Sequence, residues 1–210
     1  LAYLKSYLRI HLPQLEVKII DFHRGFSKKT IKIPKELRYL KSYYPFQDKS
    51  PFCSFHSYFR FGASAEEIEA VLIKEKPDIV GVSSLFSPYY REAIEVGQIA
   101  KKINPKIVTL FGGSHVSACP EQMLTHECVD FIIEGEGEIP TYEFCKMLLE
   151  GANNFDTIDG LGCKIDQKIH RSFKKSSPKL MELPIPDLSD FELNDYLYEG
   201  KPLSFVITSR

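Results

Sequence analysis

Small and polar residues gather at three points of the sequence, each directly after a short apolar run. Ser83-Ser84-Leu85 follows "DIVGV", Gly112-Gly113-Ser114-His115 follows "KIVTLF", and Glu134-Gly135-Glu136-Gly137-Glu138 follows "VDFII". Paired glycines let a flat ligand lie against bare backbone, and a neighbouring serine can hydrogen-bond a buried ligand nitrogen. Each signal is weak alone, because Gly-Gly is commonly a turn and serines commonly cap helices. Their recurrence after successive apolar runs predicts a ligand-binding site.

Other kinds of site fit the sequence less well. "GEGE" is not the G-x-G-x-x-G of dinucleotide-binding proteins, its carboxylates would repel a pyrophosphate, and no G-K-[ST] loop occurs. Neither an H-E-x-x-H motif nor a Cys/His ligand spacing is present, and the serines lack a convincing order of His and Asp partners. We therefore expect no catalytic residue and no metal ligand here, and we interpret the chain as a binding module.

Strand and helix patterns alternate along the chain and would position these residues. Strands that alternate with helices of this length indicate βαβ units and a doubly wound, Rossmann-like or flavodoxin-like parallel sheet of the α/β class. The carboxyl ends of such strands meet at one edge of the sheet, where ligands bind. The predicted helices are 1–12, 64–77, 87–103, 120–126 and 140–151, and the predicted strands are 16–21, 78–84, 106–113 and 129–135.

The domain organisation follows from where this alternation stops. We expect an α/β domain over residues 1–150, interrupted by an insertion at 27–63 that is rich in Lys, Tyr and Phe. That insertion is either an irregular segment packed on the sheet edge or a lid over a ligand. Residues 151–210 are predicted to form a hairpin turning at 166–168 and a proline-punctuated connector, both outside the sheet.

Composition limits the partners. The chain is 43% hydrophobic and 26% charged with a net charge of -1, so it carries no electrostatic signature of nucleic acid or anionic membrane binding. No apolar run approaches the roughly 20 residues of a membrane span. Five cysteines without a C-x-x-C pair fit reduced thiols in the cytoplasm. Because the sequence starts without Met, in helical register, and stops within the strand-like "LSFVITSR", we expect a piece of a longer polypeptide.

Residues 77–144 carry a resemblance to a known family. "PDIVGVSSLFSPYYREAIEVGQIAKKINPKIVTLFGGSHVSACPEQML" followed by "VDFIIEGEGEIPTYEF" resembles the N-terminal cobalamin-binding domain of B12-dependent radical S-adenosylmethionine (radical SAM) proteins. The resemblance implies that the S-x-L element, Ser83 and Leu85, and the GG element, Gly112 and Gly113, accommodate the nucleotide tail of cobalamin. The tip Gly135 to Glu138 would lie on the next loop. We expect a leucine substituted at either glycine to weaken cobalamin binding and to leave the fold largely intact.

The same resemblance extends to the end of the chain. "LPIPDLSDF" and "FVITSR" resemble the lead into the family's catalytic barrel, whose first strand runs into a cysteine-rich loop. A [4Fe-4S] cluster and S-adenosylmethionine would then belong to a C-terminal radical SAM domain, and this chain alone would not be catalytic. The parent would be a methyltransferase or related radical enzyme. A scaffold domain that has lost corrin binding, or a flavin or nucleotide site, is the alternative.

His23 is not expected to bind cobalt. Many cobalamin domains present a histidine from a D-x-H-x-x-G loop after their first strand, whereas Asp21 to Gly25 is one residue short of that motif and follows the second strand by our count. By that count the first strand and its loop lie before Leu1. The lower axial ligand therefore cannot be assigned within this chain.

Overall fold

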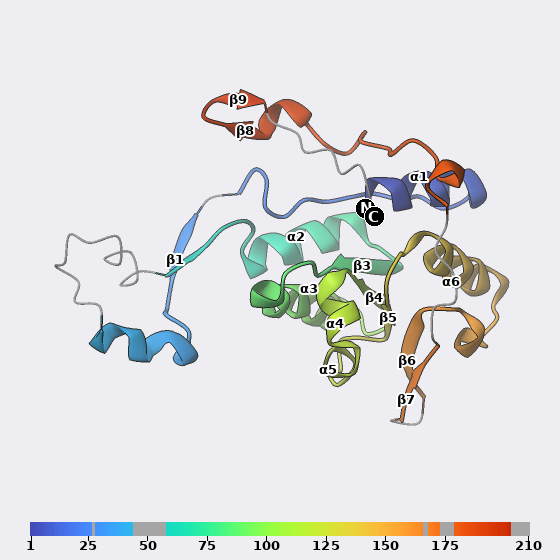
Figure 1. Ribbon diagram of the computed structural model, residues 1–210, viewed down its shortest axis with the longest axis horizontal. Helices are drawn as coiled ribbons and strands as arrows, with labels where there is room; N and C mark the ends of the chain where they lie inside the picture. The colour runs from blue at the N-terminus through green and yellow to red at the C-terminus, as the bar shows by residue number, and fades with distance from the viewer. Residues whose placement is uncertain (27, 44–57, 166–167, 173–178, 203–210) are drawn as a thin grey trace. The chain divides into compact units, whose positions relative to one another are not determined.

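The computed structural model describes residues 1–26, 28–43, 58–165, 168–172 and 179–202 (Figure 1). The chain divides into two compact units. The first comprises residues 1–20 and 65–210, and the second comprises residues 21–64. The two units are described separately below.

A five-stranded sheet forms the centre of the first unit, in the order β3-β4-β5-β6-β7 (Figure 1). The strands β3 (Ile79–Ser83), β4 (Val108–Gly112) and β5 (Phe131–Ile133) run parallel, with Ser83 opposite Gly112 and Leu110 opposite Phe131. Their carboxyl ends therefore meet at one edge of the sheet. This arrangement confirms the predicted α/β class and brings the three sequence clusters to the same edge.

The C-terminal hairpin was predicted to lie outside the sheet, and that prediction is wrong. β6 (Leu161–Ile165) pairs antiparallel with β5, and β7 (Lys168–Arg171) pairs antiparallel with β6. The physical reason is burial: Leu161 and Cys163 are enclosed against the apolar core, and β6 satisfies a backbone edge of β5 that would otherwise be open. The sheet is consequently mixed rather than wholly parallel.

Residues 15–20 differ from the prediction as well. Residues 16–21 were predicted to form a strand, yet 15–20 run without a strand partner among the described residues, and β3 lies at the edge of the sheet. Leu15 and Val17 pack against the apolar core, and polar contacts also hold the segment. Lys18 Nζ lies 2.7 Å from Glu75 Oε1, and the Ile19 amide donates to Asp190 Oδ2 at 2.6 Å.

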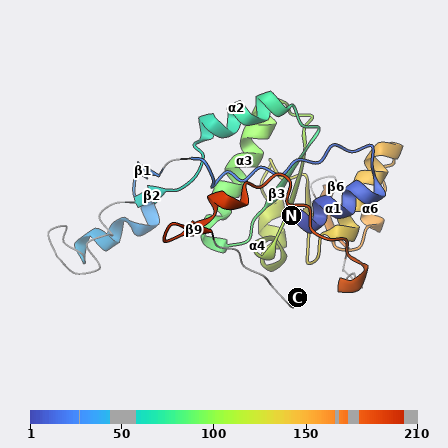
Figure 2. The ribbon, with the colours of Figure 1, turned by 90° about the horizontal axis from the view of Figure 1, so that it is seen from above.

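Helices cover both faces of the sheet, as a doubly wound fold requires. The helices α1 (Ala2–His11) and α6 (Glu138–Glu150) pack on one face, where Leu8 and Phe144 share a core with Leu110 and Ile133. The helices α3 (Tyr90–Ile103), α4 (Ser114–Ala118) and α5 (Pro120–Leu124) pack on the other, around Phe111. The view from above shows α1 and α6 grouped away from α3 (Figure 2).

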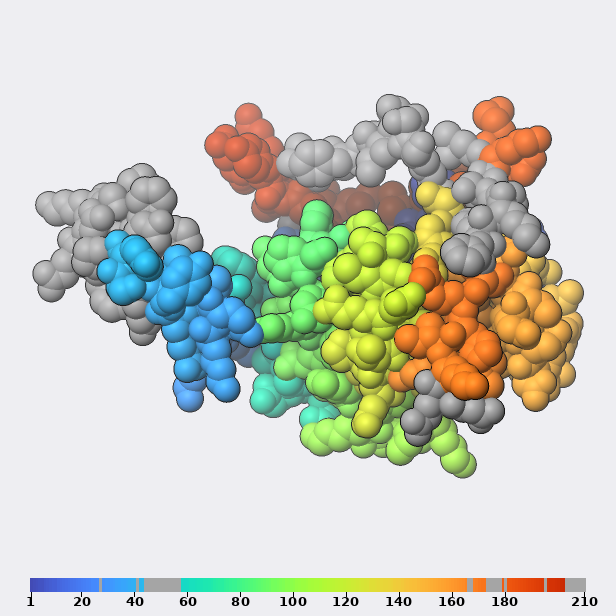
Figure 3. All heavy atoms as spheres, turned by 60° about the horizontal axis from the view of Figure 1, so that its bottom comes forward, coloured from blue at the N-terminus to red at the C-terminus, as the bar shows by residue number. Residues whose placement is uncertain are grey.

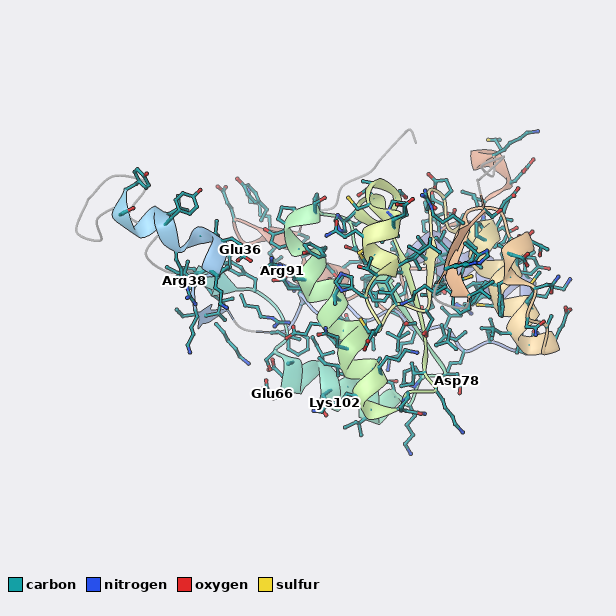
Figure 4. The ribbon with its side chains drawn as sticks, turned by 90° about the horizontal axis from the view of Figure 1, so that it is seen from below. Glu36, Arg38, Glu66, Asp78, Arg91 and Lys102 are labelled. Carbon is teal, nitrogen blue, oxygen red and sulfur yellow. The ribbon has the colours of Figure 1, made fainter. Side chains whose placement is uncertain are left out.

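The helix α2 (Ala65–Glu75) lies beside α3. It begins directly after Ser64 and ends before Pro77, in agreement with the predicted helix at 64–77. A salt bridge of 3.1 Å joins Lys102 of α3 to Glu69 of α2. Figure 4 labels Lys102 and Glu66 on these two neighbouring helices.

The predicted helix at 87–103 is divided at its start. A 3-10 turn, η3 (Ser87–Tyr89), precedes α3, and the side chain of Ser87 does not cap it. Instead Ser87 Oγ lies 2.9 Å from Nδ1 of His115. Ser87 thus connects the loop after β3 to α4.

The remaining elements are short. After α6 come the 3-10 turns η4 (Phe155–Thr157), η5 (Leu180–Glu182) and η6 (Leu193–Asp195) and the paired strands β8 (Leu197–Tyr198) and β9 (Lys201–Pro202). The predicted strand at 203–210 lies outside the described residues. Among those that the structure describes, none of the helices combines the length and apolar content that crossing a membrane requires.

The second unit contains most of the predicted insertion. β1 (Lys29–Ile31) pairs antiparallel with β2 (Tyr58–Arg60), and η1 (Lys35–Ser42) follows β1. Lys28 Nζ lies 3.7 Å from the centre of the Phe59 ring, a cation–π contact. Residues 27 and 44–57 of the insertion lie outside the described part, so whether it forms a lid stays a prediction.

Gly97 provides a test of how closely α3 packs on the sheet. A Cβ at this position would lie 2.9 Å from the Phe111 ring and 3.1 Å from the Cys128 carbonyl oxygen. Gly97→Ala gains about 1 kcal/mol of helix propensity, but overpacking costs about 1–3 kcal/mol. We expect a net loss of stability in urea unfolding followed by circular dichroism. The matched control on the exposed side of α3, Gln98→Ala, should change stability by less than about 0.5 kcal/mol. A Gly97→Ala protein as stable as the parent would contradict this packing.

Candidate functional site

A cleft of about 450 Å³ lies in the first unit, between the sheet and the helices α1 and α6. The strands β3, β4 and β5 form its floor near their carboxyl ends, α1 and residues 15–20 form an outer wall, and the start of α6 forms the opposite wall. The cleft therefore lies at the edge where the sequence predicted a ligand site.

The floor is hollow because side chains are small or absent there. Gly81 and Ser83 of β3 and Gly112 of β4 all line the cleft, and Ser83 lies directly opposite Gly112. A Cβ added to Gly81 would meet nothing within 4 Å, and one added to Gly112 would meet only the Ile133 carbonyl oxygen at 3.9 Å. Space that ordinary side chains would fill is thus left open on the sheet.

Gly81 was not among the predicted site residues. It lies in the middle of β3, where glycine weakens a strand and often marks close approach of a ligand. Because strand residues alternate between faces, Gly81 and Ser83 share a face of the sheet. The sequence signal was present in the fourth letter of "DIVGVSS".

The walls change character along the cleft. Away from the strand tips they include Leu4 and Leu8 of α1 and Cys145 of α6, and burial raises the pKa of the Cys145 thiol to about 11, which keeps it neutral. Near the tips the lining is Ser83, Gly113 and residues 135–138. A ligand with an apolar end and a polar end fits this arrangement.

Four predicted residues join the loops after β3 and β4 instead of lining the cleft. The Ser84 amide donates to the Gly112 carbonyl at 2.8 Å, and the His115 amide donates to the Ser84 carbonyl at 3.1 Å. Ser114 Oγ donates to the Leu85 carbonyl at 2.5 Å. These bonds make the two loops one connected body, with Leu85 on its surface.

Gly113 belongs to the contact between these two loops, although it also borders the cleft. Its φ is +107°, and a Cβ there would lie 2.6 Å from the Ser84 carbonyl oxygen. The two glycines of the predicted pair therefore differ: Gly112 leaves room for a ligand, whereas Gly113 lets the backbone pass close to Ser84.

Two buried polar atoms lie at the contact between the same two loops. Ser84 Oγ and His115 Nε2 have no hydrogen-bond partner among the described residues, although His115 is only 4% exposed and its ring lies 5.1 Å from that of Tyr90. Leaving such an atom unpaired costs about 1–3 kcal/mol. A bound water or ligand group would offset that cost.

The Glu-Gly-Glu-Gly-Glu cluster has two parts. Glu134 forms a paired salt bridge with Arg171 of β7, with contacts of 2.8 and 2.7 Å, and this raises the pKa of Arg171. Arg171 also contacts Glu121 at 3.1 Å, and Figure 3 shows α5 beside the hairpin. Glu134 thus anchors β7, whereas Gly135, Glu136, Gly137 and Glu138 line the cleft.

Metal ligands are absent from the described part of the chain: no group of three or more His, Cys, Asp or Glu side chains there could hold an ion. Cys119, Cys128, Cys145 and Cys163 are free thiols, and Cys53 lies outside the described residues.

Comparisons with known proteins point to one family. The family model of the B12 binding domain matches residues 56–144. An uncharacterized methyltransferase of Pyrococcus horikoshii is 32% identical over 146 residues, which are 69% of this chain and 31% of that protein. Cytidylyl-2-hydroxyethylphosphonate methyltransferase of Streptomyces wedmorensis is 31% identical over 104 residues, 50% of this chain and 19% of that protein. The chain thus spans a third or less of the length of these relatives.

A solved structure shares the fold. The cobalamin-dependent S-adenosylmethionine radical enzyme OxsB, with aqua-cobalamin bound, superimposes with a TM-score of 0.52 at 22% identity, over 61% of this chain and 18% of OxsB. The family match identifies residues 56–144 as a B12 binding domain, and the likeness to OxsB shows that a cobalamin-dependent radical SAM enzyme shares its fold.

Proposed function

We propose that the cleft binds the nucleotide tail of cobalamin and that the chain is the cobalamin-binding module of a radical SAM enzyme. The observation that carries this proposal is the hollow floor at Gly81, Ser83 and Gly112, open to a cleft of about 450 Å³. That volume lies within the range of roughly 300–1,000 Å³ typical of ligand sites.

The residues fit an elongated ligand that enters at the strand tips. Its apolar base would rest on Gly81 between the leucines of α1 and Cys145 of α6. Ser83 and the backbone of Gly112 and Gly113 would contact its polar part. The carboxylates of Glu136 and Glu138 disfavour a phosphate beside them, so we place the phosphate on the β3 and β4 side.

The corrin ring would lie outside the cleft, over the strand tips. Leu85, Phe86 and Tyr89 follow β3 and are 55%, 65% and 63% exposed, and the Phe86 and Tyr89 rings lie 6.5 Å apart. A flat macrocycle would cover these side chains and remove them from water.

The described cleft offers cobalt no imidazole. No histidine of the described residues lines it, and His115 packs against Tyr90 instead. His23 belongs to the second unit, where its amide donates to Asp21 Oδ1 at 2.8 Å. That His23 is not a cobalt ligand stays a prediction.

The longer protein would be an enzyme. Cobalamin supplies a cobalt atom that can carry a methyl group, and both curated relatives above are named methyltransferases. We propose that a C-terminal radical SAM domain holds the [4Fe-4S] cluster and S-adenosylmethionine, and that the reaction is methyl transfer or a related radical step.

Gly81→Val tests the tail site directly. The new side chain enters open space, and valine favours strands, so stability should stay within about 1 kcal/mol of the parent. Affinity for hydroxocobalamin, measured by absorbance titration, should fall by about tenfold or more because the floor is filled. Cobinamide, which lacks the nucleotide tail, is the control: its binding should be unchanged.

The two ligands separate the possible outcomes. If Gly81→Val weakened the binding of hydroxocobalamin and of cobinamide equally, the nucleotide tail would not be bound at Gly81. A parent chain that binds neither ligand would support a scaffold domain and overturn the proposal. Flavin absorbance in the purified chain would instead indicate a flavin site.

Gly112→Leu and Gly113→Leu should have different consequences. The side chain that Gly112→Leu adds would occupy the cleft with little strain and weaken hydroxocobalamin binding in a folded protein. The side chain that Gly113→Leu adds would clash with the Ser84 backbone at a positive φ and destabilise the fold by about 2 kcal/mol or more. Urea unfolding and cobalamin titration of both variants check this, and equal stability of the two would contradict the proposed division of roles.

The sequence of the longer gene tests the enzyme assignment. We expect a C-x-x-x-C-x-x-C loop within a few residues after Arg210, because three thiolates leave one iron of a [4Fe-4S] cluster open for S-adenosylmethionine. A protein extended through that loop should bind iron after anaerobic reconstitution, and the 210-residue chain should not. A gene without such a triplet would rule out the radical SAM assignment.

A further inference from the structure

The connector after the hairpin lies across α1, and the buried cation Lys5 holds it there. We call residues 184–191 the strap. Lys5 is only 5% exposed, and its Nζ lies 2.6 Å from Asp190 Oδ2 and 3.0 Å from Ser189 Oγ. A lysine is seldom buried unless it is paired. In Figures 1 and 2 the orange-red chain of the strap passes close to α1.

Other contacts along the strap fix its register on α1. Ser6 Oγ donates to the Ile185 carbonyl at 2.6 Å, and the Asp187 amide donates to the Ala2 carbonyl at 3.1 Å. Hydrogen bonds from Ser189, and then from Arg9, hold the pKa of Asp187 below its usual range. Prolines at 184 and 186 limit the backbone freedom of the same stretch.

Asp190 joins the strap to a second element. Its Oδ2 atom accepts both from Lys5 Nζ and from the Ile19 amide. Lys5 lies on α1 and Ile19 lies in the segment 15–20, and both border the cleft, whose lining includes no strap residue. One carboxylate oxygen therefore ties together the two parts of the outer wall.

This tie matters because, apart from the packing of Leu15 and Val17 against the apolar core, the segment 15–20 has few contacts that fix its position. It has no strand partner among the described residues, and its charged contact, Lys18 with Glu75, involves a half-exposed lysine. Exposed ion pairs contribute little to stability. The ion pair of Asp190 with the buried Lys5 contributes more, and its oxygen is the one that the Ile19 amide also contacts.

We propose that Lys5 and Asp190 are positioning residues that latch the strap onto α1 and residues 15–20, so that the strap sets the position of the cleft's outer wall. Of the two latch residues, Lys5 borders the cleft and Asp190 does not, so Asp190 is the one that separates positioning of the wall from direct contact with the ligand. Its effect on binding rests on the proposed function, whereas its effect on the wall does not.

Hydrogen–deuterium exchange of the 210-residue chain tests the latch. Asp190→Asn keeps the shape of the side chain but removes the charge that holds Lys5, and Lys5→Met keeps the length of the stem. In both variants we expect backbone exchange in residues 15–20 to rise by about tenfold, while peptides from β4 and β5 exchange as in the parent. Asp190→Glu, which keeps a carboxylate, should restore part of the protection.

Arg9→Gln is the matched control. Arg9 pairs with the same strap, but its side chain is 58% exposed and its partner is Asp187 rather than Asp190. Exchange in residues 15–20 should therefore stay within about twofold of the parent. If Asp190→Asn does not fold, the Lys5→Met/Asp190→Asn double variant, which removes both charges, is measured in its place.

Titration with hydroxocobalamin supplies the second readout. The two latch variants should bind it about three- to tenfold more weakly, mainly through faster release, and Arg9→Gln should bind it as the parent does. Unchanged exchange in residues 15–20 in a folded latch variant would overturn the latch. A parent that binds no cobalamin but shows the exchange changes would overturn the proposed function and leave the latch standing.

Discussion

The absence of side-chain volume on one face of the sheet is the constraint on which the site depends. Gly81 and Gly112 leave bare backbone, and Ser83 carries only a small side chain, at positions where packed sheets normally carry large apolar residues. A hollow of this kind weakens the core, and the walls must stand far enough from the sheet to keep it open. The fold meets this requirement by packing α1 and α6 on one another as well as on the sheet, through Tyr7 and Tyr142.

The loops after β3, β4 and β5 must also be held in place at the mouth of the cleft. A ligand mouth lined by small residues would be mobile if each strand tip stood alone, because glycine lowers the cost of backbone motion. Here the loops after β3 and β4 bond to each other through Ser84 and Ser114, and Gly135 donates to Ser117 Oγ at 2.8 Å. Rigidity thus comes from contacts between neighbouring tips, made through Ser84, Ser114 and Ser117, which do not line the cleft.

Local sequence patterns predicted the fold class and the edge of the sheet that carries the site. The periodicity of apolar residues and the positions of turn residues can both be recognised within a short segment. Gly81 could have been predicted in the same way, because it lies two residues before Ser83 on the same strand and therefore on the same face of the sheet. The different roles of Gly112 and Gly113 depend on a contact with Ser84, 29 residues before Gly113 in the sequence. The pairing of β6 with β5 and the burial of Lys5 likewise depend on distant partners, and no local pattern encodes them.

A charged latch suits the outer wall better than apolar packing would. Apolar contacts stabilise at least as well as a buried ion pair, whose desolvation offsets much of its attraction. They are not directional, however, so an apolar strap could slide along α1 with little change in energy. A carboxylate oxygen that must serve both Lys5 Nζ and the Ile19 amide fixes the strap, the helix and the segment 15–20 in one register. The wall packs on the sheet through Leu8 and Leu110 but finds no side chain at Gly81 or Gly112, and there that directionality maintains the width of the cleft.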